Sequence, residues 1–275
     1  MDFNTSKPEP YIASIMTAVS VFLLLGLIYF IIVCEIYTRE KELSLKTIFT
    51  PFSSLLILMI TCQTGVYACE IFAFSEKAYR WTREYAELFA VQTWFIVLQE
   101  ASYLFYSYLR AAPLFEDVFP RIAPALALGM KLMPILFVCQ GVIGVARVVF
   151  FDDPEPFEII AQCDQFIPVL IAVCMLTFDI TSLVTFTTFL KRTSVAEKME
   201  DKQFLIISHH GIAAVVVCFL IIVCYAITAL FGSADALLLG FLFSTIMYLL
   251  LFRMKAQERI RSLNGSTAHR TSASV

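Results

Sequence analysis

The sequence has few of the side chains that enzymes use for catalysis and metal binding. Only 16% of its 275 residues are charged, and only three are histidines. His209 and His210 are adjacent and would point about 100° apart on a helix, and His269 lies far along the chain. The sequence has no zinc-protease motif, no nucleophile elbow and no glycine-rich phosphate loop. These absences favour a protein that is not an enzyme and needs neither a metal nor a cofactor.

The last apolar segment, 236–253, also lacks a lysine, and the nearest one is Lys255 just beyond it. A retinal-binding pump needs a lysine inside that segment to form its Schiff base. The sequence therefore argues against a retinal protein.

Apolar residues, by contrast, are abundant. They make up 59% of the chain, and the mean hydropathy is +0.80, whereas soluble domains are about 45–50% apolar. The pattern predicts an all-α integral membrane protein with a seven-helix transmembrane domain at 11–253, and the lipid bilayer as its first partner. A short segment, 1–10, would precede it, and a tail, 254–275, would form a short amphipathic helix and then a disordered end. The predicted spans are about 11–33, 49–74, 86–110, 123–151, 166–190, 204–231 and 236–253.

Basic residues are unevenly divided between the two predicted faces. Fourteen lie on one side and four on the other, so the positive-inside rule predicts an external N-terminus and a cytoplasmic C-terminus. The fourteen are Arg39, Lys41, Lys46, Arg110, Arg121, Lys191, Arg192, Lys198, Lys202, Arg253, Lys255, Arg259, Arg261 and Arg270; the four are Lys7, Lys77, Arg80 and Arg83. The outer loop after 123–151 carries five acids and no base, and is either a solvated connection or an acidic lip that attracts a cationic ligand. Its acids are Asp152, Asp153, Glu155, Glu158 and Asp164.

The segment 86–110 is too polar to face lipid on all sides. At helical spacing its polar residues form one stripe, so we expect this helix to lie inside the bundle. The stripe comprises Gln92, Gln99, Tyr103, Tyr106 and Arg110. With polar and aromatic residues of other spans, it suggests the walls of a ligand cavity. The candidates for these walls are Glu70, Gln92, Trp94, Gln99, Tyr103 and Tyr225.

Three ionisable residues are predicted at nearly the same depth on three consecutive spans. Glu100, Lys131 and Asp179 each lie roughly 14–17 Å from the inner face at ~1.5 Å per residue. An unpaired charge at this depth costs about 2.5–3.5 kcal/mol or more, so we expect the three to face one another. Such a polar cluster would either fix the packing of the helices or act as a switch or ion-coordinating site.

Eight cysteines are present, and most lie within the predicted spans. Cys69 and Cys163 are expected near the outer face, where oxidation is permitted. They form a candidate disulfide, which requires their Cα atoms to come within about 7 Å.

Seven spans, an external N-terminus and short loops resemble a rhodopsin-like G-protein-coupled receptor. Arg110, with Pro113-Leu114 shortly after, stands near the place of the arginine in the family's Asp-Arg-Tyr motif. Tyr248 matches the tyrosine of Asn-Pro-x-x-Tyr, and Cys224-Tyr225 approximates the start of Cys-Trp-x-Pro. The resemblance implies a divergent orphan receptor of the plasma membrane, with an outward-facing ligand cavity among the third, fifth, sixth and seventh spans.

The same resemblance implies a heterotrimeric G protein as the cytoplasmic partner, with Arg110, Lys191, Arg192 and Tyr248 as coupling residues. An extracellular ligand is expected, and the acidic outer loop would favour a cationic one. The alternative is a small secondary transporter or channel that uses the intramembrane charges as a coupling site. A structural scaffold is a third possibility, and no nucleic-acid partner is expected.

Overall fold

The computed structural model describes residues 9–36, 50–73, 82–197, 202–231 and 234–272. These residues are helical apart from short turns and contain no strand, so the all-α prediction is confirmed for them. The helices are α1 (Glu9–Phe30) with a π-helical continuation η1 (Ile31–Ile36), α3 (Pro51–Ala73), α4 (Arg83–Val118), α5 (Ala123–Val149), α6 (Pro154–Glu197), α7 (Lys202–Phe231) and α8 (Ala234–Ser272). Together they form a seven-helix bundle.

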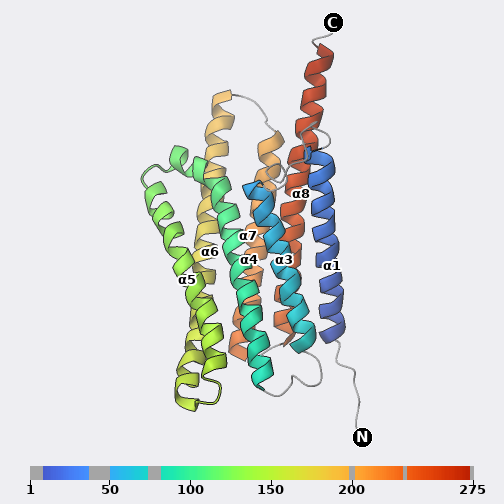
Figure 1. Cartoon of the computed structure of the whole chain (residues 1–275). Coiled ribbons are helices and arrows are strands. Elements are labelled where there is room, and N and C mark those ends of the chain that lie inside the picture. Colours follow the sequence, from blue (N-terminus) through green and yellow to red (C-terminus); the bar gives the residue numbers. More distant parts are fainter. Residues whose placement is uncertain (1–8, 37–49, 74–81, 198–201, 232–233, 273–275) are drawn as a thin grey trace.

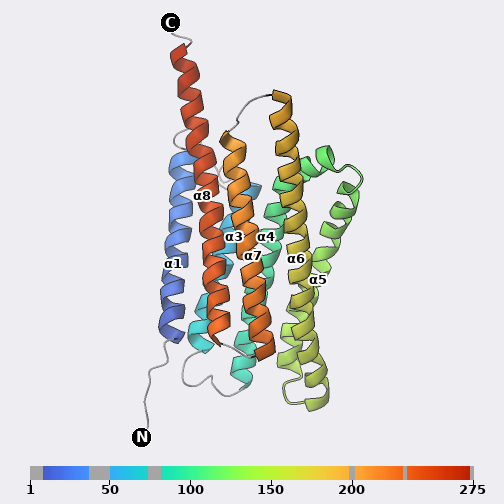
Figure 2. The ribbon, with the colours of Figure 1, turned by 180° about the vertical axis from the view of Figure 1, so that it is seen from behind.

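Successive helices run in alternating directions, so the bundle has two distinct ends (Figure 1). The Arg110 end holds the C-terminal parts of α4, α6 and α8. The Arg147 end holds the turn between α5 and α6. Figure 2 shows the same bundle from behind, with α7 between α6 and α8. Because α4 packs against α3, α5 and α6, it is a central helix, as its polar stripe predicts.

The exterior of the bundle is apolar. Six helical segments are long and apolar enough to cross a membrane, and α7 contributes a shorter apolar stretch, Ile212–Thr228. The six are Tyr11–Val33, Pro51–Ala73, Arg83–Val118, Ala123–Val149, Glu155–Phe189 and Asp235–Gln257. Large apolar side chains such as Phe22, Phe72 and Ile135 are exposed. An apolar surface of this kind indicates a membrane protein.

Two helices begin with recognisable signals in the sequence. The Thr82 hydroxyl accepts a hydrogen bond from the Tyr85 backbone N–H at 3.3 Å and so caps the start of α4. The turn at 119–122 then leads into α5, which has Pro124 in its first turn, where a missing N–H costs nothing. Thr82 thus marks the start of α4 and Pro124 the start of α5.

The predicted acidic loop is largely helical. Asp152 and Asp153 lie in the turn, but α6 already begins at Pro154, so Glu155, Glu158 and Asp164 belong to its first turns. Proline and acidic residues both favour a helix N-terminus, which explains the early start. The predicted span 166–190 is therefore only the middle of a longer helix.

The tail also differs from its prediction. Instead of a separate amphipathic helix after residue 253, α8 continues without a break to Ser272. Near this point the Lys255 ammonium donates to the Ser53 hydroxyl at 2.7 Å and ties α8 to α3. Residues 1–8 and 273–275 lie outside the described residues, as do Arg39, Lys41 and Lys46.

The contact between α4 and α5 is unusually close. A Cβ atom at Gly141 would lie 2.8 Å from the Trp94 ring, and one at Gly144 would lie 3.1 Å from Thr93. Small residues let two helix backbones approach in this way inside a membrane.

Candidate functional site

Two cavities follow one another along α4, where it meets α6, α7 and α8. The Glu100 cavity lies deeper in the bundle, and the Asp179 cavity lies toward the Arg110 end. The space open to the centres of water molecules is about 90 Å³ in the first and 130 Å³ in the second. Each can therefore hold several waters or a small organic molecule.

The polar wall of the Glu100 cavity is cross-linked by Gln99. Its Nε2 donates to Gln63 Oε1 on α3 at 2.5 Å and to the Tyr248 hydroxyl on α8 at 2.6 Å. One amide group thus connects three helices around the cavity. The polar and aromatic side chains that line it are Gln63, Gln99, Glu100, Tyr103, Tyr225, Phe241, Ser244 and Tyr248.

Two polar atoms in this wall have no partner. Glu100 Oε2 and Gln63 Nε2 are both buried, and neither has a hydrogen bond within the part of the chain that the structure describes. None of the described residues that line the Glu100 cavity is a lysine, arginine or histidine. A buried acceptor and a buried donor without partners are costly, so the cavity calls for a complementary occupant.

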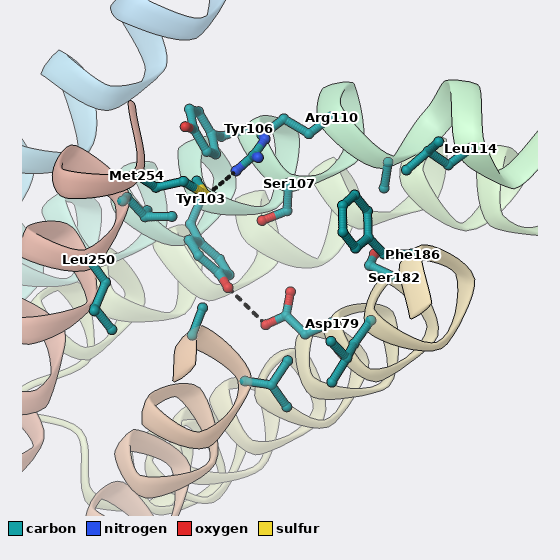
Figure 3. Close-up of a pocket in the computed structure, with 15 residues that line it drawn as sticks. Tyr103, Tyr106, Ser107, Arg110, Leu114, Asp179, Ser182, Phe186, Leu250 and Met254 are labelled. Carbon is teal, nitrogen blue, oxygen red and sulfur yellow. Dashed lines mark hydrogen bonds between the residues drawn. The ribbon is translucent and has the colours of Figure 1, made fainter. Parts of the chain in front are cut away.

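The two cavities meet at Tyr103, the one residue that lines both. Its hydroxyl donates to Asp179 Oδ2 on α6 at 2.9 Å, as Figure 3 shows. Asp179 is only 5% exposed and also accepts a hydrogen bond from the Cys218 thiol of α7. Cys218 lines the Glu100 cavity, whereas Asp179 lines the other. Tyr103 and Cys218 therefore form a partition with Asp179 on its far side.

The Asp179 cavity extends toward the Arg110 end, where Arg110 lines it. Arg110 donates to the Met254 sulfur at 3.0 Å, and its guanidinium carbon lies 5.9 Å from the centroid of the Tyr106 ring (Figure 3). The Ser182 hydroxyl is buried in this cavity and has no hydrogen-bond partner among the described residues. Ser182 lies three residues after Asp179 and so on the same helix face, a signal that the sequence already contained.

Three of the six cavity candidates line the Glu100 cavity, namely Gln99, Tyr103 and Tyr225. Glu70 and Gln92 instead form a buried hydrogen bond with each other. Trp94, which is 36% exposed, packs over Gly141 at the α4–α5 contact and lines neither cavity.

The positions of these side chains follow from helical geometry. Trp94 comes two residues after Gln92 and so points about 200° away from it around the helix axis. Gln92 and Gln99, seven residues apart, share a face.

The prediction that Glu100, Lys131 and Asp179 face one another is wrong for Lys131. Glu100 and Asp179 lie on either side of the Tyr103 partition, but the Lys131 side chain is exposed on the outside of α5. Depth can be counted from the sequence, but the face of the helix is set by packing. The buried positions of α5 are Met130, Met133, Phe137, Gln140, Gly141 and Gly144, and Lys131 is rotated about 100° from the first of them.

The predicted disulfide is also absent. Cys69 and Cys163 are both free thiols, the first buried and the second exposed. Their helices have different main neighbours, since α3 packs on α1 and α4, whereas α6 packs on α4, α5 and α7.

The predicted coupling residues divide into two groups. Lys191 and Arg192 are exposed near the end of α6, and Arg110 lines the Asp179 cavity at the same end of the bundle. Tyr248 is different, because it is buried in the Glu100 cavity with Gln99 as its partner. The prediction placed it near the end of the last span, but α8 continues far beyond it.

A further buried ion pair joins three helices at the Arg147 end. Arg147 of α5 donates to Asp164 of α6, and each side chain is only 11% exposed. The guanidinium also lies 4.9 Å from the ring centroid of Phe89 on α4 and 5.7 Å from that of Phe157 on α6. This arrangement has the character of a structural lock.

No group of three His, Cys, Asp or Glu residues that could hold a metal ion occurs in the described ranges. Compared with known protein families and with curated protein sequences, the chain matches none. The class is therefore defined by the fold and the site alone: a seven-helix bundle with an apolar exterior and two internal cavities divided by Tyr103.

Proposed function

We propose that the chain is a divergent seven-transmembrane receptor that binds a ligand in the Glu100 cavity and signals at the Arg110 end. One observation carries this proposal: the cavity lies between α4, α6, α7 and α8, the third, fifth, sixth and seventh helices, with Gln63 and Val66 of α3 completing its wall. These are the helices that line the ligand cavity in the receptor family that the sequence resembles.

Tyr103 provides a route from the ligand to the far end of the bundle. A ligand in the Glu100 cavity contacts Tyr103, whose hydroxyl is bonded to Asp179 of α6. Moving that side chain changes the α4–α6 contact beside Arg110. A ligand that binds one arrangement of this contact better than the other shifts their populations.

The proposed orientation places the Arg110 end in the cytoplasm. In the described residues, Arg110, Arg121, Lys191, Arg192 and Lys255 lie toward that end, in keeping with the positive-inside rule. A cytosolic signalling protein would dock there, and the resemblance nominates a heterotrimeric G protein. The membrane would be the plasma membrane.

Two measurements test the proposal. In intact cells an epitope at the N-terminus should be accessible to antibody and one at the C-terminus protected; an externally accessible C-terminus refutes the receptor. With the reconstituted chain, basal nucleotide exchange should be measured on a panel of purified G proteins. Exchange should depend on Arg110, so Arg110→Ala should abolish it, whereas Arg83→Ala, which removes an exposed cation at the opposite end of the bundle, should leave it unchanged.

A small transporter or channel remains the second candidate, because the two cavities lie in series and share Tyr103. Rotation of that single side chain would join them. Proteoliposomes loaded with a pH-sensitive dye would detect proton flux. A proton flux that is higher in Tyr103→Ala than in the unaltered chain would support the transporter proposal. No flux in either the unaltered chain or the variant would support the receptor proposal.

A further inference from the structure

The Glu100 carboxyl group lacks a counter-charge. It forms no ion pair in the described part of the chain, and one of its oxygens is buried without a hydrogen bond. The residue expected to neutralise it, Lys131, points away from the bundle. By contrast Glu70, another buried acid, accepts a hydrogen bond from Gln92. A buried carboxyl group without a counter-charge either takes up a proton or is stabilised as a carboxylate by a cation that comes from outside the bundle.

Aromatic rings surround the same space. Tyr103, Tyr225, Tyr248 and Phe241 all line the Glu100 cavity, and the rings of Tyr225 and Phe241 meet edge to face at 6.4 Å between centroids. The faces of aromatic rings attract organic cations, most strongly where water is excluded. A carboxylate among several rings is the combination that recognises an ammonium group rather than a strongly hydrated metal ion.

Gln63 adds a second requirement for the molecule that occupies the Glu100 cavity. Its Oε1 is engaged by Gln99, which holds the side chain in place. Its Nε2 forms no hydrogen bond of full geometry, and the acceptor beside it, the Tyr67 hydroxyl, is already bonded to Phe241 and Thr245. An occupant that satisfied the whole wall would therefore carry an oxygen acceptor as well as a cation. The cavity is small, with about 90 Å³ open to the centres of water molecules, so this occupant has few heavy atoms.

We propose that the Glu100 cavity binds a small organic ammonium ion that carries a hydroxyl or carbonyl oxygen. Its ammonium group lies against Glu100 and the tyrosine rings, and its oxygen accepts from Gln63 Nε2. The assignment rests on the proposed function only for the signalling role of this ligand. The binding itself is independent of that function.

Isosteric probe pairs test the charge requirement directly. Ethanolammonium and 1-propanol differ in one position, where nitrogen carrying a charge replaces carbon. Choline and 3,3-dimethylbutan-1-ol form a larger pair of the same kind. Saturation-transfer NMR on the full chain in lipid nanodiscs measures their binding even when it is weak. We expect at least one cation of the two pairs to bind with about tenfold or greater preference over its neutral partner.

Variants then locate the site. Glu100→Gln should weaken cation binding by about ten- to a hundredfold, because it removes the negative charge that pairs with the ammonium group. Glu70→Gln is the matched control, since it removes a buried carboxyl group outside the cavity, and it should leave the affinity within about threefold of that of the original chain. If Glu100→Gln does not fold, the isosteric pairs measured on the unaltered chain still decide the charge requirement.

Each result has a definite meaning. Equal binding of both cations and their neutral partners, or no binding of any probe, overturns the proposal, as does an unchanged affinity in Glu100→Gln. Cation binding without any change in nucleotide exchange leaves the ligand class standing and refutes the receptor role. A change in nucleotide exchange caused by a ligand without an ammonium group supports the receptor role and refutes the ammonium ligand class.

Discussion

The Arg147–Asp164 pair offers the sharpest test of how the bundle is held together. Both side chains are 11% exposed, so the pair behaves as a buried one. Removing one partner of a buried pair costs about 3–5 kcal/mol, because the other charge is left without compensation. The cation–π contacts with Phe89 and Phe157 add about 0.5–2 kcal/mol on the arginine side. Arg147→Met should therefore lower the free energy of unfolding by about 3–5 kcal/mol or somewhat more.

The double variant gives the magnitude of the coupling. Asp164→Leu alone leaves the guanidinium buried beside two rings and should cost about 3 kcal/mol. Arg147→Met combined with Asp164→Leu leaves no buried charge, so it should cost only about 4–5 kcal/mol, well below the sum of about 6–8 kcal/mol for the two single substitutions. We therefore expect a coupling energy of about 2–3 kcal/mol, at the upper end of the range for residues in contact.

Unfolding by SDS in mixed micelles, followed by circular dichroism, measures these free energies. The exposed pair Arg83–Glu87, whose side chains are 64% and 59% exposed, provides the control. Arg83→Ala should change the free energy by less than about 0.5 kcal/mol. Strict additivity of the two substitutions at Arg147 and Asp164 would refute the reasoning, because it would show that the two side chains do not interact.

Three further predictions concern the packing of individual helices. Tyr67→Phe removes the buried hydroxyl that bonds Thr245 and a backbone carbonyl of α8, so it should cost about 1–3 kcal/mol in the same SDS titration. Gly141→Val should cost about 1–3 kcal/mol by overpacking against Trp94, and Trp94→Ala in the same chain should relieve part of the loss. Lys131→Met should not destabilise the bundle, because the lysine faces outward; a loss above about 1 kcal/mol would place it in a buried contact after all.

The fold class and the helix centres could be predicted from the sequence, because long apolar runs have no alternative in a bilayer. The ends of the helices were harder to predict from the sequence. The start of α6 at Pro154 lies in a stretch whose charge is typical of a loop. The end of α8 lies in polar sequence, where hydropathy carries no signal.

The site was only partly predictable for a related reason. The polar stripe on α4 fixes a face, so Gln99 and Tyr103 could be placed in a cavity. Lys131 and Trp94 could not be placed, because the sequence gives the depth of a single residue but not the direction in which it faces. That direction depends on how the neighbouring helices pack. Glu100 was therefore assigned the wrong partner, although its depth and its polar surroundings were anticipated.

The unbroken course of α8 gives the molecule a mechanical property. Tyr248 ties the middle of this helix to Gln99 in the Glu100 cavity, and the same helix runs on for eighteen residues beyond Met254. At ~1.5 Å per residue that extension is about 27 Å long. The end of α8 lies about 36 Å from Tyr248 by the same count, so a tilt of about 10° at Tyr248 would move this end by roughly 6 Å. If the chain acts as the proposed receptor, this stiff helix would carry a small movement beside the Glu100 cavity to a larger displacement at its C-terminal end, where a neighbouring protein could detect it.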